Sequence, residues 1–183
     1  LGALLKAVMI NGARPMTGFN SDGIPLDPPP SCRQGWGRIN IYASIRLPTA
    51  KHELFVWQTE SLSQVTQKTG ICLQVTDSEE ALRATLVWYD PAPEFVSDGT
   101  MINDLDMSVQ VFPEKKQIWP VIGMEDRINN VEKMIWSSPE KKVYYVKIFA
   151  HRLQTVQKFT LAVTGQFIIH SYNEEQCESY ALF

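Results

Sequence analysis

The 183-residue chain is 44% hydrophobic and 20% charged, a composition typical of a folded globular protein with enough apolar residues for a core. Its formal net charge of -3 excludes the strongly basic surface that nucleic-acid binding or attraction to an anionic membrane would need. No apolar run approaches the roughly 20 residues of a bilayer span, and the first residues lack the pattern of a signal peptide. The length fits one sandwich-sized domain plus a smaller part.

The first 49 residues form the smaller part and carry two helical patterns. Residues 1–11 have apolar side chains four apart, with Asn11-Gly12 as the stop. Because this pattern is already helical at the start and lacks an initial Met, we expect the chain to be a piece of a longer protein. Residues 13–31 are rich in Pro and Gly and predict a surface loop, and a short helix is expected over residues 41–47.

From residue 50 onward the pattern changes to short strands separated by turns. Period-two alternation is clearest in residues 82–89 and 105–112, which are expected to form one hairpin or one crossing between sheets. The regular spacing predicts a mainly β domain, an antiparallel jelly-roll-like sandwich, over residues 50–169. Residues 170–183 show no periodicity and are expected to be a tail. The expected strands are 52–58, 63–68, 71–76, 82–89, 105–112, 118–120, 131–137, 143–150 and 159–168.

Two carboxylates are expected on one face of the strand near residue 105. Asp104 and Asp106 are two positions apart, so their side chains leave the same face of the sheet about 7 Å apart. A hard cation such as Ca²⁺, which takes roughly six to eight oxygen ligands, would relieve the repulsion between them. Asn103, Asp126 and Asn129 could supply further oxygens if the fold brings them near. A structural calcium site is therefore one hypothesis for these residues.

A salt-bridge cluster is the alternative to a calcium site at these residues. In this alternative Arg127 and Arg83 pair with the two aspartates, and the asparagines that follow Arg127 cap a loop. The sequence leaves both hypotheses open, because it does not fix how close residues 126–130 lie to the carboxylates.

The cysteines and histidines lack the close spacing of a zinc site. Cys32, Cys72 and Cys177 allow one disulfide with a free thiol, or three free thiols, so the sequence leaves the redox compartment open. The histidines have no metal-binding spacing and are expected at the surface or at strand edges. They are His52, His151 and His170.

Several motifs together resemble one family. LLKAVMINGAR and QGWGRINIYASI resemble the last two helices of the catalytic domain of a subtilisin-like serine protease (subtilase, peptidase S8 family). LRATLVWYDPAP, INDLDMSVQV, DRINNVEKMIW and VYYVKIFAHRL…QKFTLAVTGQF resemble the C-terminal jelly-roll domain that alkaline subtilases carry behind the catalytic domain. The order and spacing agree over nearly all of residues 1–168, and the loop at 20–31 and the residues after 170 depart from the family.

The resemblance implies the end of an α/β catalytic domain followed by a β-sandwich that stabilises it and helps recruit protein substrates. It also implies structural calcium, a secreted or endomembrane (lysosomal) location, and the upstream catalytic domain as the partner. The family's Ser, His and Asp segments, of GTSMA, HGT and DTG type, do not occur in this chain. A catalytic triad needs all three groups within hydrogen-bond reach, so no catalytic residue is expected here and the chain alone should hydrolyse no peptide.

Two alternatives remain at this stage. One is a free-standing lectin-like or adhesion β-sandwich that uses exposed tryptophans, with Trp57 and Trp119 as the leading candidates, whereas Trp88 occupies an apolar strand position and is expected to pack in the core. The other is the small piece of a processed protease that stays bound to its catalytic piece.

Overall fold

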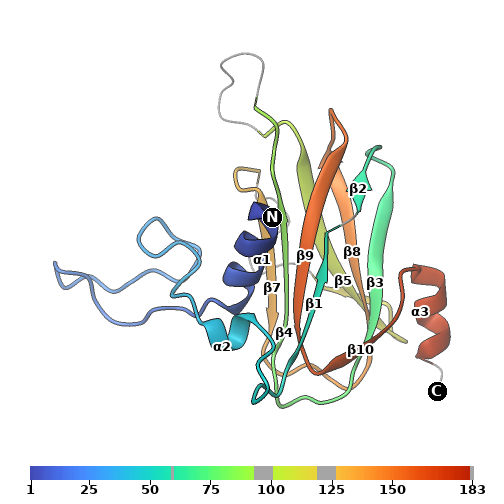
Figure 1. Ribbon diagram of the computed structural model, residues 1–183, viewed down its shortest axis with the longest axis horizontal. Helices are drawn as coiled ribbons and strands as arrows, with labels where there is room; N and C mark the ends of the chain where they lie inside the picture. The colour runs from blue at the N-terminus through green and yellow to red at the C-terminus, as the bar shows by residue number, and fades with distance from the viewer. Residues whose placement is uncertain (59, 93–100, 119–126, 182–183) are drawn as a thin grey trace.

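The computed structural model describes residues 1–183 except 59, 93–100, 119–126 and 182–183, and its regular structure is mainly β (Figure 1). The helices are α1 (Gly2–Gly12), α2 (Ile41–Ser44) and α3 (Glu174–Tyr180). The strands are β1 (Glu53–Trp57), β2 (Ser61–Leu62), β3 (Lys68–Val75), β4 (Leu82–Trp88), β5 (Asp104–Phe112), β6 (Lys116–Ile118), β7 (Val131–Trp136), β8 (Val143–Arg152), β9 (Gln157–Gly165) and β10 (Phe167–Ser171).

The strands form two antiparallel sheets. The first sheet has the order β1-β9-β4-β7, with β2 also paired to β9, and the second has the order β10-β3-β8-β5-β6. β4 and β5 lie in different sheets, so the two alternating runs form a crossing between sheets and not a hairpin. The prediction of a mainly β, antiparallel domain is therefore confirmed.

The hydrophobic core lies between the facing sides of the two sheets. Alternating residues of β4, such as Leu86 and Trp88, share one buried cluster with Val146 and Ile148 of β8. Trp88 is fully buried, as its apolar strand position predicted. Burial of this cluster removes apolar side chains from water and is the main source of stability for such a domain.

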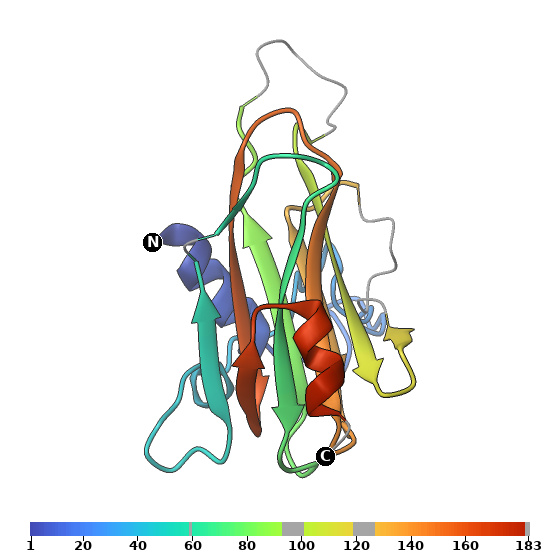
Figure 2. The same ribbon diagram turned by 90° about the vertical axis from the view of Figure 1, so that its right-hand side faces the viewer.

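Helices cover part of the outer face of each sheet. α1 packs across β4 and β9 of the first sheet, and α3 lies on β3, β8 and β10 of the second sheet (Figure 2). Strands beneath a helix are buried on both faces, which is why β4 is buried along almost its entire length. No helix in the described part of the chain is long and apolar enough to cross a membrane.

Several expected boundaries differ from the structure. The strand predicted at residues 63–68 is wrong, because β2 ends at Leu62 and a turn leads into β3. The strand predicted at 159–168 is two strands, since Gly165, with φ of 155°, lies at the point where the chain leaves β9 and enters the other sheet in β10. The expected tail contains α3, and the helix expected over 41–47 ends at Ser44.

Residues 14–38 form an irregular arm that projects away from the sheets (Figure 1), as the Pro- and Gly-rich composition predicted. The side chain of Gln34 is buried inside this arm. Its Oε1 accepts a hydrogen bond from the backbone N–H of Met16 at 2.8 Å, and its Nε2 donates to the carbonyl oxygen of Asp27. One glutamine therefore joins segments of the arm that are far apart in sequence.

Candidate functional site

The predicted carboxylate pair lies on the outer face of the second sheet, on β5. Asp104 and Asp106 are both nearly buried, at 2% and 7% exposure. The guanidinium Nη1 of Arg127 lies 3.1 Å from Oδ2 of Asp104 and 3.0 Å from Oδ1 of Asp106. The structure thus brings together the two aspartates and the arginine of the salt-bridge hypothesis. Arg83 belongs to β4 in the first sheet, where its charged neighbours are Arg14 and Glu80, so its predicted role in this cluster is wrong.

Burial controls the electrostatics of this cluster. It raises the pKa of Asp104 and of Asp106 above the usual value for Asp, although the nearby Arg127 lowers both pKa values. Oδ1 of Asp104 is buried and has no hydrogen-bond partner among the described residues.

The remaining predicted ligands are only partly placed. Asp126 lies outside the described residues, and Asn129 lies in the segment before β7, where it makes contacts of its own. Among the described residues no group of three or more His, Cys, Asp and Glu side chains could hold a metal ion. Calcium at Asp104 and Asp106 therefore stays a prediction.

Thermal unfolding separates the calcium site from a purely internal ion pair. If calcium binds the folded protein only, calcium at a hundred times its dissociation constant should stabilise the protein by about 2.7 kcal/mol. Asp106→Asn should abolish this gain, because it removes one of the two carboxylates. Melting temperatures measured with calcium and with a chelator test this. A wild-type melting temperature that ignores both additions would assign the cluster to Arg127 alone.

Asn103, another predicted calcium ligand, joins three parts of the fold. Its Oδ1 accepts hydrogen bonds from the backbone N–H groups of Gln154 (2.8 Å) and Thr155 (3.1 Å). Its Nδ2 donates to Oγ1 of Thr155 (2.9 Å) and to Oε1 of Gln157 (2.8 Å). Its carbonyl oxygen accepts from the indole N–H of Trp88 at 2.9 Å. The side chain is fully buried and serves the turn between β8 and β9.

Asp90 is a structural residue that the sequence reading missed. Its carboxylate accepts hydrogen bonds from the backbone N–H groups of Ile102 and Asn103, both at 2.6 Å. The partners lie 12 and 13 residues further along the chain, so the local sequence around Asp90 carries no signal for these bonds. Asp90 fixes the chain at the point where it enters β5.

Helix α1 is joined to the first sheet by buried polar contacts. Nδ2 of Asn11 donates to Oγ1 of Thr164 at 2.9 Å, and Oγ1 of Thr85 donates to Oδ1 of Asn11 at 3.0 Å. All three side chains are fully buried. Ala7 packs beside them against Val87, in an apolar cluster shared with β7 and β9.

Lys133 of β7 strengthens the same attachment. Its ammonium group donates to the carbonyl oxygens of Ile10 and Ala13 at the end of α1, where helix carbonyls lack partners within the helix. It also lies 6.0 Å from the ring centre of Trp36. Burial, with a smaller contribution from Arg83, lowers the pKa of Lys133 to about 8. One side of α1 therefore attaches residues 1–49 to the first sheet.

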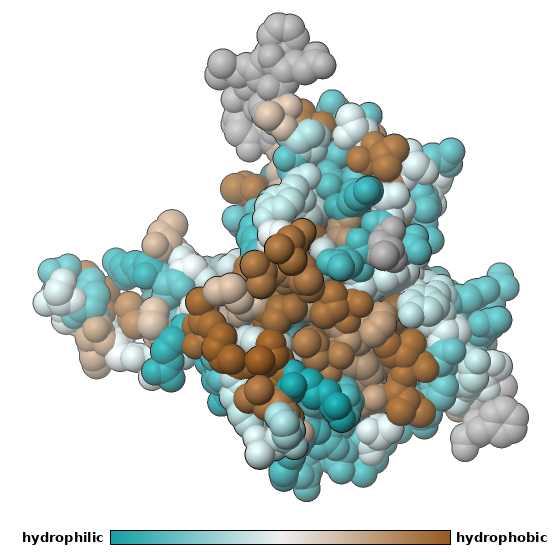
Figure 3. All heavy atoms as spheres, viewed as in Figure 1, coloured by the Kyte–Doolittle hydropathy of each residue, from teal (hydrophilic) through white to brown (hydrophobic). Residues whose placement is uncertain are grey.

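The other side of this helical unit presents apolar side chains to solvent in the described chain. Leu5 of α1 is 55% exposed and Ile41 of α2 is 57% exposed. Figure 3 shows hydrophobic residues gathered over α1, α2 and the neighbouring β1 on this side of the molecule. We call the exposed apolar residues of the two helices, with Leu1 just before α1 and Ile45 just after α2, the apolar helix face. It consists of Leu1, Leu5, Met9, Ile41, Tyr42 and Ile45.

The two helices that form this face are held close together. A Cβ atom added at Gly12 would lie 2.6 Å from the backbone nitrogen of Ser44, so only glycine allows α1 and α2 this approach. The side chain of Asn40 caps α2 by accepting from the N–H of Ala43. The helical unit is therefore a preformed surface and not two independent segments.

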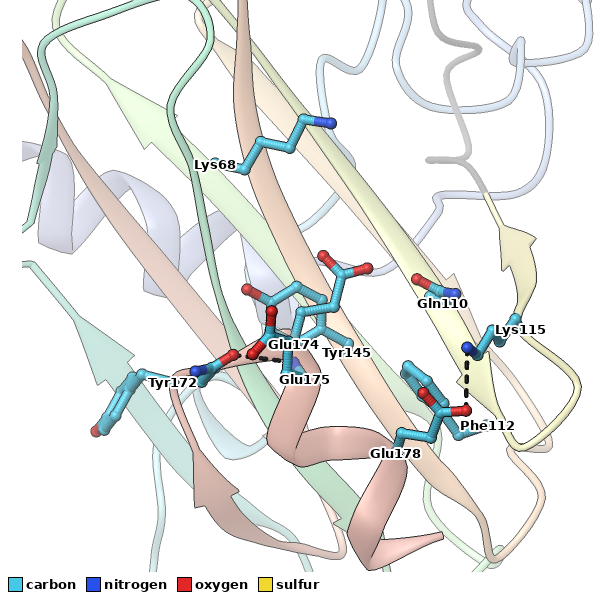
Figure 4. Close-up of a pocket in the computed structure, with 10 residues that line it drawn as sticks. Lys68, Gln110, Phe112, Lys115, Tyr145, Tyr172, Glu174, Glu175 and Glu178 are labelled. Carbon is cyan, nitrogen blue, oxygen red and sulfur yellow. Dashed lines mark hydrogen bonds and ion pairs between the residues drawn. The ribbon is translucent and has the colours of Figure 1, made fainter.

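A pocket of about 630 Å³ lies between α3 and the outer face of the second sheet (Figure 4). Its charged groups are partly paired with each other, since Lys115 and Glu178 lie 3.0 Å apart. The lining residues are Lys68, Gln110, Phe112, Lys115, Tyr145, Tyr172, Asn173, Glu174, Glu175 and Glu178. No serine, cysteine or histidine is among these residues, so the pocket has no Ser–His or Cys–His pair in the described part of the chain.

The tryptophans and histidines form no common site among the described residues. Trp57 is buried against Phe159 and Tyr172, and Trp119 lies outside the described residues.

His151 is exposed, as expected. His52 is buried beside the carbonyl oxygen of Ile45, so the expectation of an exposed or edge position is wrong there.

Of the cysteines, Cys72 of β3 and Cys177 of α3 form a disulfide, and Cys32 is a free, exposed thiol in the arm. The first of the two arrangements left open by the sequence is thus the one found.

Comparison with known proteins adds no family. No protein-family model matches the chain, and no curated protein matches it. The function is therefore inferred from the geometry and from the motifs.

Proposed function

We propose that this chain is the C-terminal, non-catalytic portion of a subtilisin-like serine endopeptidase. The catalytic domain hydrolyses peptide bonds through an acyl-enzyme, and the β domain described here stabilises it and helps bring protein substrates to it. In this proposal residues 1–49 contain the last two helices of the catalytic domain, and α1 and α2 would be these helices.

The observation that carries the proposal is the two-sided character of the α1–α2 unit. One side is fixed to the β domain through Asn11, Lys133 and Ala7. The other side is the apolar helix face, which a free-standing module would have no reason to expose, because exposed apolar patches commonly mark protein interfaces. A second domain that packs on this face would turn α1 into a helix buried between two domains.

The strand order supports a jelly-roll sandwich of the kind that follows subtilase catalytic domains. Eight strands divide into the sets β1-β9-β4-β7 and β3-β8-β5-β6. Within each set, strands from the first half of the domain sequence alternate with strands from the second half. This arrangement fits a double-sheet jelly roll with two added strands: the short β2, which pairs with β9, and β10 at the edge beside β3. The Cys72–Cys177 disulfide fits folding in an oxidising, secreted or endomembrane compartment.

The direct test identifies the reactive serine. A fluorophosphonate probe labels activated serines, and we expect it to label a polypeptide that contains these residues or stays bound to them in the native protein. The labelled serine should lie in a GTSMA-type segment encoded upstream of Leu1. Absence of both the label and this segment would reject the protease and favour an independent binding module.

A charge on the apolar helix face should weaken the protease. Leu5→Asp would place an unpaired carboxylate in the interface with the catalytic domain, which should lower the stability of the native protein by about 2 kcal/mol or more. We expect peptidase activity to decay several-fold faster at elevated temperature. Val156→Asp is the matched control, because Val156 is 63% exposed in the turn before β9 and lies outside this face. Equal decay in the two variants would contradict a buried interface at α1.

A further inference from the structure

Helix α3 rests on the second sheet through a narrow contact. It has seven residues, of which Cys177 alone is buried. A helix this short has little stability of its own in water, since isolated helices shorter than roughly 12–15 residues are marginal. The position of α3 therefore depends on what binds it to the sheet.

The side of α3 that carries its glutamates borders the pocket instead of packing on the sheet. Glu174, Glu175 and Glu178 line this pocket beside the aromatic side chains of the sheet (Figure 4). The ion pairs Lys147–Glu174 and Lys115–Glu178 span 2.8 Å and 3.0 Å but are partly exposed, and such pairs hold surface elements only weakly.

The ring of Tyr180 adds one further contact, stacking on His170 at the end of α3. The residue is still 37% exposed. Apart from the main chain that leads from β10 into α3, the disulfide is thus the one covalent attachment of α3 to the sheet among the described residues.

Beneath α3 lies an apolar floor on the outer face of the sheet. Phe112 of β5, Val143 and Tyr145 of β8 and Cys72 of β3 form this floor, and each is at most 3% exposed. This cluster is separate from the main core, which lies between the two sheets. Loss of α3 would therefore expose the floor and leave the main core in place.

We propose that the Cys72–Cys177 disulfide is the fastening that keeps α3 over this floor, and that reduction by a dithiol releases the helix. A dithiol reductant opens it in two steps. One thiolate of the reductant attacks a sulfur of the disulfide, which breaks the S–S bond and releases the other cysteine as a thiolate. The second thiol of the reductant then displaces the first cysteine, so that two electrons and two protons convert the disulfide to two thiols while the dithiol becomes a cyclic disulfide. Both cysteines are fully buried, so the attack follows a transient opening of α3.

Hydrogen exchange on the native protein tests the fastening. The protein is treated with dithiothreitol and then iodoacetamide, and mass spectrometry verifies that Cys72 and Cys177 are alkylated. We expect the amides of residues 174–180 to exchange about tenfold faster or more after reduction, because local opening then becomes easier. Peptides from β4 and β9 should exchange at an unchanged rate. Binding of an apolar dye should rise in parallel as Phe112, Val143 and Tyr145 become accessible.

A pair of serine variants separates the fastening from general effects of thiol chemistry. Cys177→Ser should reproduce fast exchange in α3 without any reductant, whereas Cys32→Ser removes the exposed thiol and should leave α3 protected. Unchanged protection of α3 after verified reduction would overturn the proposal. So would a parallel loss of protection in β4 and β9, because the disulfide would then support the whole domain and not α3 in particular.

Discussion

Replacing Asn103 with leucine is expected to lower the free energy of unfolding by about 4 kcal/mol, since each buried polar group left without a partner costs roughly 1–3 kcal/mol. Leucine has the same number and branching of side-chain heavy atoms, although it is bulkier, and it offers no hydrogen bond. The backbone N–H groups of Gln154 and Thr155 would lose their acceptor, and Oε1 of Gln157 would lose a donor. The turn between β8 and β9 would then have unsatisfied groups in a buried position.

Denaturant unfolding of the two proteins measures this effect. Gln117→Leu is a suitable control, because Gln117 is an exposed amide on β6 and its replacement should change stability by at most about 0.5 kcal/mol. A loss below about 1 kcal/mol for Asn103→Leu would mean that water or a rearranged turn satisfies these groups. Oδ1 of Asn103 already accepts hydrogen bonds from the backbone N–H groups of Gln154 and Thr155. It therefore has no free lone pair for a calcium ion in this arrangement.

Removal of Arg127 is expected to be the second large effect. Arg127→Ala leaves Asp104 and Asp106 nearly buried and close together without their shared counter-charge. Removal of one partner of a buried ion pair lowers the free energy of unfolding by about 3–5 kcal/mol. The Arg127 side chain is partly exposed, so we expect a loss near the lower end of this range. The measurement is denaturant unfolding at pH 7 with a chelator present, so that calcium cannot replace the arginine.

The loss should depend on pH in a defined direction. Burial raises the pKa of Asp104 and Asp106 in the folded protein, and removing Arg127 raises both pKa values further. A carboxyl whose folded pKa is raised binds its proton more tightly in the folded state, so its contribution to stability is present at low pH and is lost as pH rises through the folded pKa. The difference between wild type and Arg127→Ala should therefore be largest at pH 7 and shrink toward about pH 4, near the pKa of an unfolded Asp.

A surface ion pair provides the control for this pH series. Arg46 and Glu53 lie 2.7 Å apart but are both well exposed, so Arg46→Ala should change stability by at most about 1 kcal/mol at any pH in this range. If Arg127→Ala behaved like Arg46→Ala, water would have access to the two aspartates and the cluster would not be a buried one.

The sequence predicted the elements whose pattern is local. Period-two alternation placed β4 and β5 within one residue of their ends, because each strand directs one row of side chains into the core. It also placed Asp104 and Asp106 on one face, since positions two apart on a strand must share it.

What the sequence could not predict depends on contacts between distant segments. The partner of Cys177 depends on where α3 packs on the sheet. No rule of cysteine spacing predicts that Cys177 pairs with Cys72 and not with Cys32. Asn103 has the same local pattern whether its side chain binds a cation or the turn between β8 and β9, and only the position of that turn distinguishes the two. The buried attachment of α1 through Asn11 was likewise invisible, because its partners Thr85 and Thr164 lie on other strands.

The central place of β9 in the first sheet also determines the order in which the molecule can assemble. β1, β2 and β4 each pair with β9, and β1 and β4 lie on opposite sides of it. While the chain is being synthesised, these three early strands must wait for residues 157–165 before their shared edges are bonded. Pairings between such distant segments slow folding and leave strand edges open to other chains. A nascent chain of this protein should therefore remain sensitive to aggregation, and responsive to chaperones, until β9 has left the ribosome.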